Sequence, residues 1–294
     1  RTPLIHGHNA PFDYILHTYL EGAVPADPSV APSLRPSVAS CHPPDLVLWA
    51  NRGGGKTFLG AIATVLDMLF KPGIQVRILA GSLEQASRML DHLRHFFSLP
   101  DLAPHIAGRI TQRRITLTSG SAVEILAASE ASIRGTRIQK LRCDEVDLFD
   151  PDLWDAAQLT TRSATCGDVH VRGAVECLST MHRPHGLMFR LVKDCAAGTR
   201  RLFKWGVVDT LETCPPARPC QADAGDCPLL PECAGRAKRR DPMEPIAQAI
   251  DPPLSSSLDR SPDQPDPGHI SIDDAITLKS RVSHAVWESE MLCL

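Results

Sequence analysis

The 294-residue chain lacks the features that mark membrane-spanning and secreted proteins. No apolar run approaches the roughly 20 residues that a membrane-spanning helix needs, and no signal peptide pattern opens the chain. Internal repeats are also missing. Because the first residue is Arg1 rather than Met, we expect the start of the chain to be the edge of a fragment. The sequence therefore predicts a globular protein with no membrane segment and no membrane partner.

An excess of charge of one sign is missing as well. Lys and Arg number 31, and Asp and Glu number 34, which leaves a net charge of −3 at pH 7. A strongly basic total would have indicated nucleic acid through its long-range field, so only a local basic groove stays open. The hydrophobic share of 43% is ordinary for a globular core, and the length suits one large domain or two small ones.

The most informative motif that is present is the glycine loop at residues 51–57, Asn-Arg-Gly-Gly-Gly-Lys-Thr. It follows the apolar run 46–50 and precedes a helical pattern, the order of a phosphate-binding loop. Glycines allow backbone N–H groups to approach phosphates, and the helix N-terminus adds partial positive charge. We expect Lys56 to reach the β- and γ-phosphates and Thr57 to bind Mg²⁺. The residues expected to contact nucleotide here are Gly53, Gly54, Gly55, Lys56 and Thr57.

The acidic pair Asp144–Glu145 ends a strand-like run at residues 140–143. Asp144 is expected to hold Mg²⁺ directly or through water, and Glu145 to orient and deprotonate an attacking water. Lys140 and Arg142 interrupt the apolar pattern of the run. A solvated turn after a strand is the alternative interpretation of such a pair.

Two further features belong to the same predicted site. Ser179 and Thr180 follow the strand-like run 174–178, where small hydroxyl side chains can sense a γ-phosphate; a helix cap or turn is the alternative. Arg52 and Arg134 are candidates to stabilise the charge on the γ-oxygens, an effect of about 10³- to 10⁵-fold on rate. A surface charge or salt bridge is the alternative interpretation of each arginine.

The order of apolar runs and turn residues predicts an α/β protein. Strands and helices alternate along the chain, which favours a mainly parallel sheet covered by helices on both faces, here a P-loop NTPase. Strands are expected over residues 45–50, 74–80, 109–111, 114–118, 122–126, 140–143, 174–179 and 201–207, and helices over 57–70, 83–97, 186–197 and 271–292. The expected divisions are an N-terminal segment (1–44), an ATPase core (45–208), a cysteine-rich insertion (209–250) and a linker or lid segment (251–294).

The ten cysteines include one cluster, made of Cys214, Cys220, Cys227 and Cys233, with five, six and five intervening residues. Structural zinc sites usually use pairs about two to four residues apart, so the spacing is unusual. Three interpretations stay open: tetrahedral zinc, an iron–sulfur cluster, and thiols that are unligated or in disulfides. A metal here would fold the segment rather than perform chemistry, because four ligands leave no open position. The nearby basic run 235–240 could contact DNA phosphates or be a solvated loop.

In their order along the chain, these motifs resemble those of the large terminase subunit of tailed bacteriophages. That family is the ATPase motor that pumps DNA into preformed capsids. The resemblance spans about residues 10–294. It rests on the ordered set Arg52 to Thr57, Gly81 to Gln85, Ser132 to Gly135, Asp144–Glu145 and Ser179–Thr180.

The resemblance implies ATP and Mg²⁺ as cofactors, with Lys56 and Thr57 on phosphate and metal, Asp144 on metal and Glu145 as catalytic base. It also implies that Ser179–Thr180 couples hydrolysis to movement and that Arg134 reaches a neighbouring subunit's nucleotide. An arginine stands in the family's first motif where this chain has Arg52, and Ala50 in place of glycine is tolerated there. The family's adenine site lies near the N-terminus, where Phe12 and Tyr14 are candidates for stacking or for the core.

The implied partners are double-stranded DNA, the portal protein and the small terminase subunit, within a ring of identical subunits. The implied location is the cytoplasm of a bacterial host, transiently at the portal of the viral procapsid. Family members usually continue into a nuclease domain of the RNase H type. The chain stops at Leu294, about where that domain would begin, so nuclease activity is not assigned to it.

Two other classes of function stay open. One is a different P-loop DNA translocase or helicase, although helicases usually carry two ATPase lobes in one chain and one is visible here. The other is a prophage remnant or a zinc-bearing interaction module without enzymatic activity. The presence of Lys56, Thr57, Asp144 and Glu145 argues against decay of the site.

Overall fold

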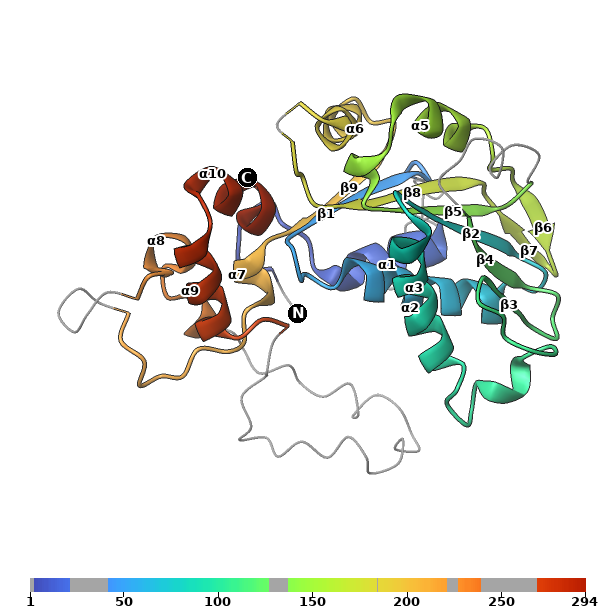
Figure 1. Ribbon diagram of the computed structural model, residues 1–294, viewed down its shortest axis with the longest axis horizontal. Coiled ribbons are helices and arrows are strands. Elements are labelled where there is room, and N and C mark those ends of the chain that lie inside the picture. The colour runs from blue at the N-terminus through green and yellow to red at the C-terminus, as the bar shows by residue number, and fades with distance from the viewer. Residues whose placement is uncertain (1–2, 22–41, 127–136, 184, 221–226, 239–268) are drawn as a thin grey trace, which may run out of the picture.

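The computed structural model describes residues 3–21, 42–126, 137–183, 185–220, 227–238 and 269–294. Among these residues the largest element is a seven-stranded sheet in the order β3-β4-β2-β5-β8-β1-β9 (Figure 1). Neighbouring strands pair in parallel, except β3 with β4. The strands are β1 (Leu46–Ala50), β2 (Gln75–Ala80), β3 (Arg114–Thr116), β4 (Ala122–Leu126), β5 (Lys140–Asp144), β8 (Ala174–Ser179) and β9 (Arg201–Trp205). The mainly parallel α/β sheet predicted from the sequence is confirmed.

Helices cover both faces of this sheet (Figure 1). Helices α1 (Pro11–Leu20), α2 (Lys56–Phe70) and α3 (Leu83–Phe96) lie on one face, and α5 (Pro151–Gln158) and α6 (Leu187–Ala196) lie on the other. Successive strand residues point to opposite faces. In β1, Leu46 and Leu48 therefore belong to the apolar core beneath α2 and α3, whereas Val47 and Trp49 belong to the core beneath α5 and α6. Burial on both faces explains why β1 is apolar at every position.

A smaller lobe follows β9 and includes the C-terminal end of the chain (Figure 1). Its elements are α7 (Val207–Thr210), α8 (Leu230–Cys233), the 3₁₀ turn η5 (Arg236–Lys238), α9 (Ile272–Arg281), α10 (His284–Val286) and the π-helical segment η7 (Trp287–Leu292). The lobe has an apolar core of its own, which includes Leu229, Ile272, Trp287 and Met291. None of the helices in the described ranges has the length and apolar character needed to cross a membrane.

Most predicted elements are present with small shifts at their ends, but two predictions are wrong. Residues 109–111 form no strand: Thr111 N donates to Arg114 O (3.0 Å) and Thr111 Oγ1 accepts from Arg114 N (2.9 Å), which closes a turn. The single helical segment expected over residues 271–292 is three pieces, α9, α10 and η7. Val282 has an extended backbone and ends α9. The side chain of Ser283 then caps the start of α10.

Helices α1 and α5 and the hairpin of β6 (Ala164–Cys166) with β7 (Val169–Val171) were not predicted. Both helices carry a start signal in the sequence. Proline occupies the first helical position of each, and Asp150 caps α5 by accepting from Leu153 N at 2.8 Å. Proline at this position costs no hydrogen bond, and aspartate is a favoured cap.

The basic residues that interrupt β5 are buried rather than solvated. Lys140, Arg142 and Asp144 share the face toward α1 and α2, while Leu141 and Cys143 join the core on the other face. The Arg142 guanidinium is fully buried and ion-paired with Asp67 (2.6 Å) and Glu176 (3.0 Å). The period-two pattern of the strand was intact, but one of its two faces is lined by paired charges instead of apolar groups.

Two 3₁₀ segments, η2 (Ala103–His105) and η3 (Val146–Leu148), complete the described elements. Segment η3 follows β5 after the single residue Glu145, at the carboxyl end of that strand. Its position matters because the loops after β1, β5 and β8 meet at that edge.

Candidate active site

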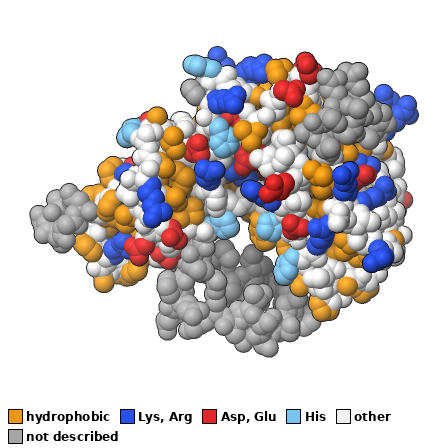
Figure 2. Space-filling model, in the orientation of Figure 1, with side chains coloured by type: hydrophobic (Ala, Val, Ile, Leu, Met, Phe, Trp, Pro, Cys, Tyr) orange, Lys and Arg blue, Asp and Glu red, His pale blue; other side chains and the backbone are white. Residues whose placement is uncertain are grey.

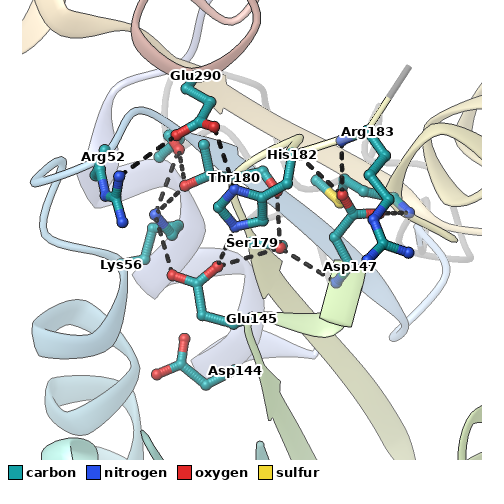
Figure 3. Close-up of polar contacts among 12 residues, drawn as sticks. Arg52, Lys56, Asp144, Glu145, Asp147, Ser179, Thr180, His182, Arg183 and Glu290 are labelled. Atoms are coloured by element: carbon teal, nitrogen blue, oxygen red, sulfur yellow. Dashed lines mark hydrogen bonds and ion pairs between the residues drawn. The ribbon is translucent and has the colours of Figure 1, made fainter. Parts of the chain in front are cut away.

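Three neighbouring strands bring the predicted motifs together. Strand β8 lies between β5 and β1, and all three run parallel. Asp144 is in register with Leu178, and Trp49 with Ser179, so the three carboxyl ends lie at one edge of the sheet. In open α/β sheets this edge is where ligands bind. Figure 3 shows the side chains from the three strand ends facing one another.

The glycine loop after β1 has a backbone that only glycines fit. Gly53 and Gly55 have φ values of 73° and 81°, in the left-handed region that other residues rarely adopt. At Gly54 a Cβ atom would lie 2.4 Å from Asn51 Oδ1, so a side chain is excluded by contact. Ala50 is different, because it is a regular strand residue paired with Trp205, and a methyl group fits there.

The ammonium group of Lys56 is buried at the start of α2. Its Nζ donates to Thr180 Oγ1 (2.8 Å), Asn51 O (3.3 Å) and Ala50 O (3.4 Å), and it lies 4.0 Å from Glu145 Oε1. The lysine therefore joins the glycine loop, the end of β5 and the end of β8. A cation held by oxygens of its own loop is placed to receive a phosphate in their stead.

Asp144 and Thr57 form a donor set suited to Mg²⁺. Thr57 Oγ1 donates to Asp144 Oδ2 at 3.0 Å, and Asp144 Oδ1 is buried with no hydrogen-bond partner among the described residues. Burial, followed by the negative charge of Glu145, raises the pKa of Asp144 to about 6. An orphaned carboxylate oxygen beside a hydroxyl offers the hard oxygen ligands that Mg²⁺ takes, so the residues present fit this ion.

Glu145 is held at the junction of β5 and η3. Its backbone is left-handed (φ 52°), and its N–H donates to Leu178 O at 2.7 Å. Its Oε2 lies 3.2 Å from His182 Nε2 and 3.4 Å from Ser179 Oγ. Burial opposes ionisation of this carboxyl, but the His182 hydrogen bond and the charge of Lys56 outweigh it and lower the pKa. The side chain is therefore a carboxylate at neutral pH, able to accept a proton.

His182 was not predicted from the sequence, and it links Glu145 to the C-terminal lobe. Its Nδ1 lies 3.4 Å from Glu290 Oε1 in η7, so the imidazole bridges two carboxylates (Figure 3). The hydrogen bond with Glu145 is the main cause that raises the pKa of His182. Glu290 also meets the glycine loop, because its backbone O accepts from Arg52 N at 3.0 Å and its Oε2 lies 3.9 Å from Arg52 Nη1.

The C-terminal lobe also lies close to the glycine loop. A Cβ atom at Gly55 would be 3.1 Å from His269 Nε2, and one at Gly53 would be 3.8 Å from Ile270 Cδ1. Figure 2 shows charged and histidine side chains gathered where this lobe meets the body that contains the sheet. The candidate site therefore lies at the boundary between the two parts of the molecule.

Asp147 is a second residue that the sequence did not reveal. Its carboxylate accepts from the backbone N–H groups of His182 (2.9 Å), Arg183 (3.1 Å) and Met188 (2.9 Å). One buried side chain after β5 thus holds the segment that leads from β8 into α6. These three hydrogen bonds connect the chain after β5 with that segment.

The remaining predicted residues divide into three groups. Ser179 and Thr180 are buried within the site, on Glu145 and Lys56 respectively. Arg134, with the motif at 132–135, lies outside the described residues. Tyr14 is fully buried against Phe203 and belongs to the core, which leaves it unable to stack on adenine.

Two cysteines lie in strands of the sheet: Cys143 in β5 and Cys177 in β8 are buried in the core. The clustered residues Cys214, Cys220 and Cys227 line one pocket together with Cys233. All four are free thiols, so a disulfide is not formed between them. Within the described ranges, no three Cys, His, Asp or Glu side chains are placed closely enough to hold a metal ion as they stand.

Comparison with known proteins identifies the fold. No family model matches the chain, and no curated protein matches it. Among solved structures, the large terminase of bacteriophage HK97 is similar over 85% of this chain and 46% of its own, with 15% identity and a TM-score of 0.52. The chain thus spans about half the length of that protein. The predicted resemblance to large terminases is confirmed at the level of the fold, a P-loop NTPase sheet flanked by helices.

Two other solved structures are also similar. The large terminase of a thermophilic bacteriophage, in complex with ADP, matches 66% of this chain and 45% of its own, with 15% identity and a TM-score of 0.45. The large terminase ATPase domain of a Thermus phage matches 56% of this chain and 76% of its own, with 16% identity and a TM-score of 0.41.

Proposed function

We propose that this chain is the ATPase region of a viral DNA-packaging motor. The observation that carries the proposal is the meeting of Lys56, Thr57, Asp144 and Glu145 at the carboxyl ends of β1, β5 and β8. A glycine loop, a buried lysine, a magnesium donor pair and an ionised carboxylate are together the parts that nucleotide hydrolysis requires. The motif order and the fold support terminase over other P-loop ATPases.

Each group of residues in the site has a separate role in the proposed hydrolysis. Backbone N–H groups of Gly53 to Gly55 and the Lys56 ammonium would bind the phosphates, and Thr57 and Asp144 would hold Mg²⁺. When bound, the ion supplies positive charge to the phosphate oxygens. Glu145 accepts a proton from the attacking water, and an arginine, either Arg52 or Arg134, offsets charge that develops on the γ-oxygens.

Coupling to movement begins at the end of β8. Thr180 gives up its place on Lys56 to the phosphate when nucleotide binds, and Ser179 touches the catalytic carboxylate. Both residues precede the segment that Asp147 ties to the end of β5. Loss of the γ-phosphate would therefore shift that segment and α6. This shift would move DNA that is held by a ring of identical subunits.

The proposed setting follows from the same assignment. Double-stranded DNA is the polymer moved, the portal protein is the docking site on the procapsid, and the small terminase subunit delivers the DNA. The motor works in the cytoplasm of the bacterial host. Arg134 is proposed to complete the site of a neighbouring subunit.

Substitution of Lys56 tests the nucleotide site. We expect Lys56→Ala to weaken ATP binding by about 10- to 100-fold, because a hydrogen bond to a charged group contributes roughly 1.5–3 kcal/mol. Calorimetric titration with a non-hydrolysable ATP analogue measures the change, and Lys193→Ala, on the exposed side of α6, is the matched control. Equal affinity in both variants would reject the site.

DNA translocation is tested separately with the full-length protein in a packaging reaction that contains procapsids, portal and linear double-stranded DNA. We expect packaging to require ATP and to stop in Lys56→Ala. ATP hydrolysis without DNA uptake, under conditions where other components are active, would assign the chain to a different class of P-loop ATPase.

His182 is proposed to position Glu145, and its replacement tests that role. We expect His182→Ala to lower kcat by about 10- to 100-fold with little change in KM for ATP, because a misplaced base slows chemistry more than binding. His182→Gln, which keeps a side-chain N–H donor, should recover part of the loss. His185→Ala is the control, since His185 is exposed and contacts Phe189. A rise in KM at unchanged kcat would contradict the positioning role.

A further inference from the structure

The C-terminal lobe contains a pocket that the ATPase site does not use. Four cysteines from two described stretches, 214–220 and 227–233, line it, and Leu211, Leu229 and Ile272 supply apolar walls. We propose that this pocket binds one structural zinc ion through the thiolates of Cys214, Cys220, Cys227 and Cys233. The inference goes beyond the proposed ATPase function and does not depend on it.

The fold places the four cysteines around one pocket although their spacing is unlike that of common zinc motifs, and no three of these thiols are close enough to hold an ion in the conformation described. Cys214 and Cys233 are 6% and 9% exposed. Cys214 N donates to Ala237 O at 3.1 Å, and Cys233 N donates to Leu229 O at 2.8 Å, so the first and last cysteines belong to one hydrogen-bonded frame. Closure around an ion requires the thiols to change rotamer, a move between staggered wells for a side chain with a single χ1 torsion.

One contact is typical of a metal-bound sulfur. Ala237 N donates to Cys233 Sγ at 3.4 Å. A backbone N–H group that donates to a sulfur holds that sulfur in place, the role that outer-shell groups play in metal sites. In an ordinary apolar core the same N–H would be expected to find an oxygen acceptor.

The described parts of the surrounding segment contain only short helical elements. Helix α8 is only four residues long, and the 3₁₀ turn η5 only three. Elements of this length are not stable alone. A tetrahedral ion that ties four points of the segment together would contribute folding free energy directly, as structural zinc sites do.

The chemistry of binding balances with groups nearby. Each of the four thiols releases one proton to solvent, and the four thiolates with Zn²⁺ carry a net charge of 2−. The positive charges of Lys238 and Arg218 act on Cys214 and offset part of this charge. Lys238 Nζ donates to the backbone oxygens of Pro216 (3.0 Å) and Arg218, which keeps its ammonium beside the loop between the first two cysteines.

The size of the pocket and its ligand type favour zinc over an iron–sulfur cluster. The cavity has a volume of about 20 Å³, room for roughly one water-sized atom or ion. A cluster of several iron and sulfide atoms would require the walls to separate. Four thiolates with no oxygen donor select a soft, tetrahedral ion such as zinc over Mg²⁺ or Ca²⁺.

The site would brace the lobe that lies over the phosphate loop. Glu232, beside Cys233, accepts from Lys279 Nζ (2.7 Å) in α9 and from Trp287 Nε1 (3.0 Å) in η7. Segment η7 carries Glu290, which contacts Arg52 and His182. A metal at the cysteines thus stabilises the frame on which these contacts depend.

Metal analysis of the purified full chain tests the proposal. We expect about one zinc per chain by mass spectrometry of the elements, and chelation should lower the thermal unfolding midpoint by at least about 5 °C. Replacement by Co²⁺ should give the absorption bands of a tetrahedral tetrathiolate site. Cys220→Ser, at a half-exposed ligand, should reduce the zinc content, whereas Cys195→Ser, at a half-exposed cysteine of α6, should retain it.

Three results would overturn the inference. They are four reactive thiols and no metal in protein prepared under reducing conditions, equal zinc content in Cys220→Ser and Cys195→Ser, and iron with sulfide in place of zinc. The Lys56→Ala variant separates this test from that of the ATPase, because it should lose nucleotide affinity while it keeps its zinc.

Discussion

Replacement of Glu145 by glutamine is expected to leave ATP binding intact and to lower the hydrolysis rate by about 10²- to 10⁴-fold. The amide keeps the size of the side chain and can still contact Ser179 and His182. It cannot accept a proton from water. Single-turnover hydrolysis measures the loss, and titration with ATP confirms that the nucleotide is still bound.

Glu124→Gln is the control for this experiment. Glu124 lies in β4, away from the three strand ends that form the site, where it pairs with Arg77 at 3.2 Å. We expect turnover in this variant to match that of the unchanged protein. Near-normal hydrolysis in Glu145→Gln would show that another group takes the proton.

Arg142→Met is expected to lower the free energy of unfolding by about 3–5 kcal/mol, the largest stability effect predicted for this chain. The substitution keeps much of the side-chain volume but leaves Asp67 and Glu176, both fully buried, without their shared cation. Thr64 Oγ1, which accepts from Arg142 Nη1 at 3.0 Å, loses this donor and keeps its hydrogen bond to Gly60 O (2.7 Å). Unfolding in urea, followed by circular dichroism, measures the change.

Arg94→Met provides the comparison, because Arg94 forms an exposed ion pair with Asp91 on α3 and an exposed hydrogen bond to Thr111 O (2.9 Å). Pairs of this kind contribute about 0–1 kcal/mol. The double variant Glu176→Gln with Arg142→Met should lose less than the sum of the single losses, since Glu176→Gln removes a buried charge whose ion pair with Arg142 is broken by Arg142→Met. Equal losses in Arg142→Met and Arg94→Met would mean that the buried ion pairs stabilise the fold no more than the exposed one.

The parts of the site that could be predicted are those written into short stretches of sequence. The glycine loop, Lys56 and Thr57 are contiguous, and the strand before them and the helix after them are visible as local patterns. Asp144 and Glu145 end a strand whose hydrophobic face was partly hidden by Lys140 and Arg142. Each of these predictions needs only that a strand end and a helix begin at the expected residues.

His182, Glu290 and Asp147 could not be found in the same way. Glu290 is 108 positions beyond His182 in the chain, and no local pattern links them. Their contacts exist because η7 packs against the glycine loop and because Asp147 lies beneath the turn after β8. The broken helix at residues 271–292 was missed for a related reason, since only the packed lobe decides where that segment bends.

The amino-acid sequence by itself determined the fold class, the order of the sheet-forming segments and the residue types available for phosphate and magnesium. These follow from backbone preferences and from apolar periodicity, which act over a few residues. Only the tertiary structure decided which face of β5 carries buried ion pairs, which carboxylate meets His182, and that four cysteines line one pocket. Such outcomes depend on burial and on the geometry of segments far apart in the chain, where a charge is stable only if folding brings it a partner.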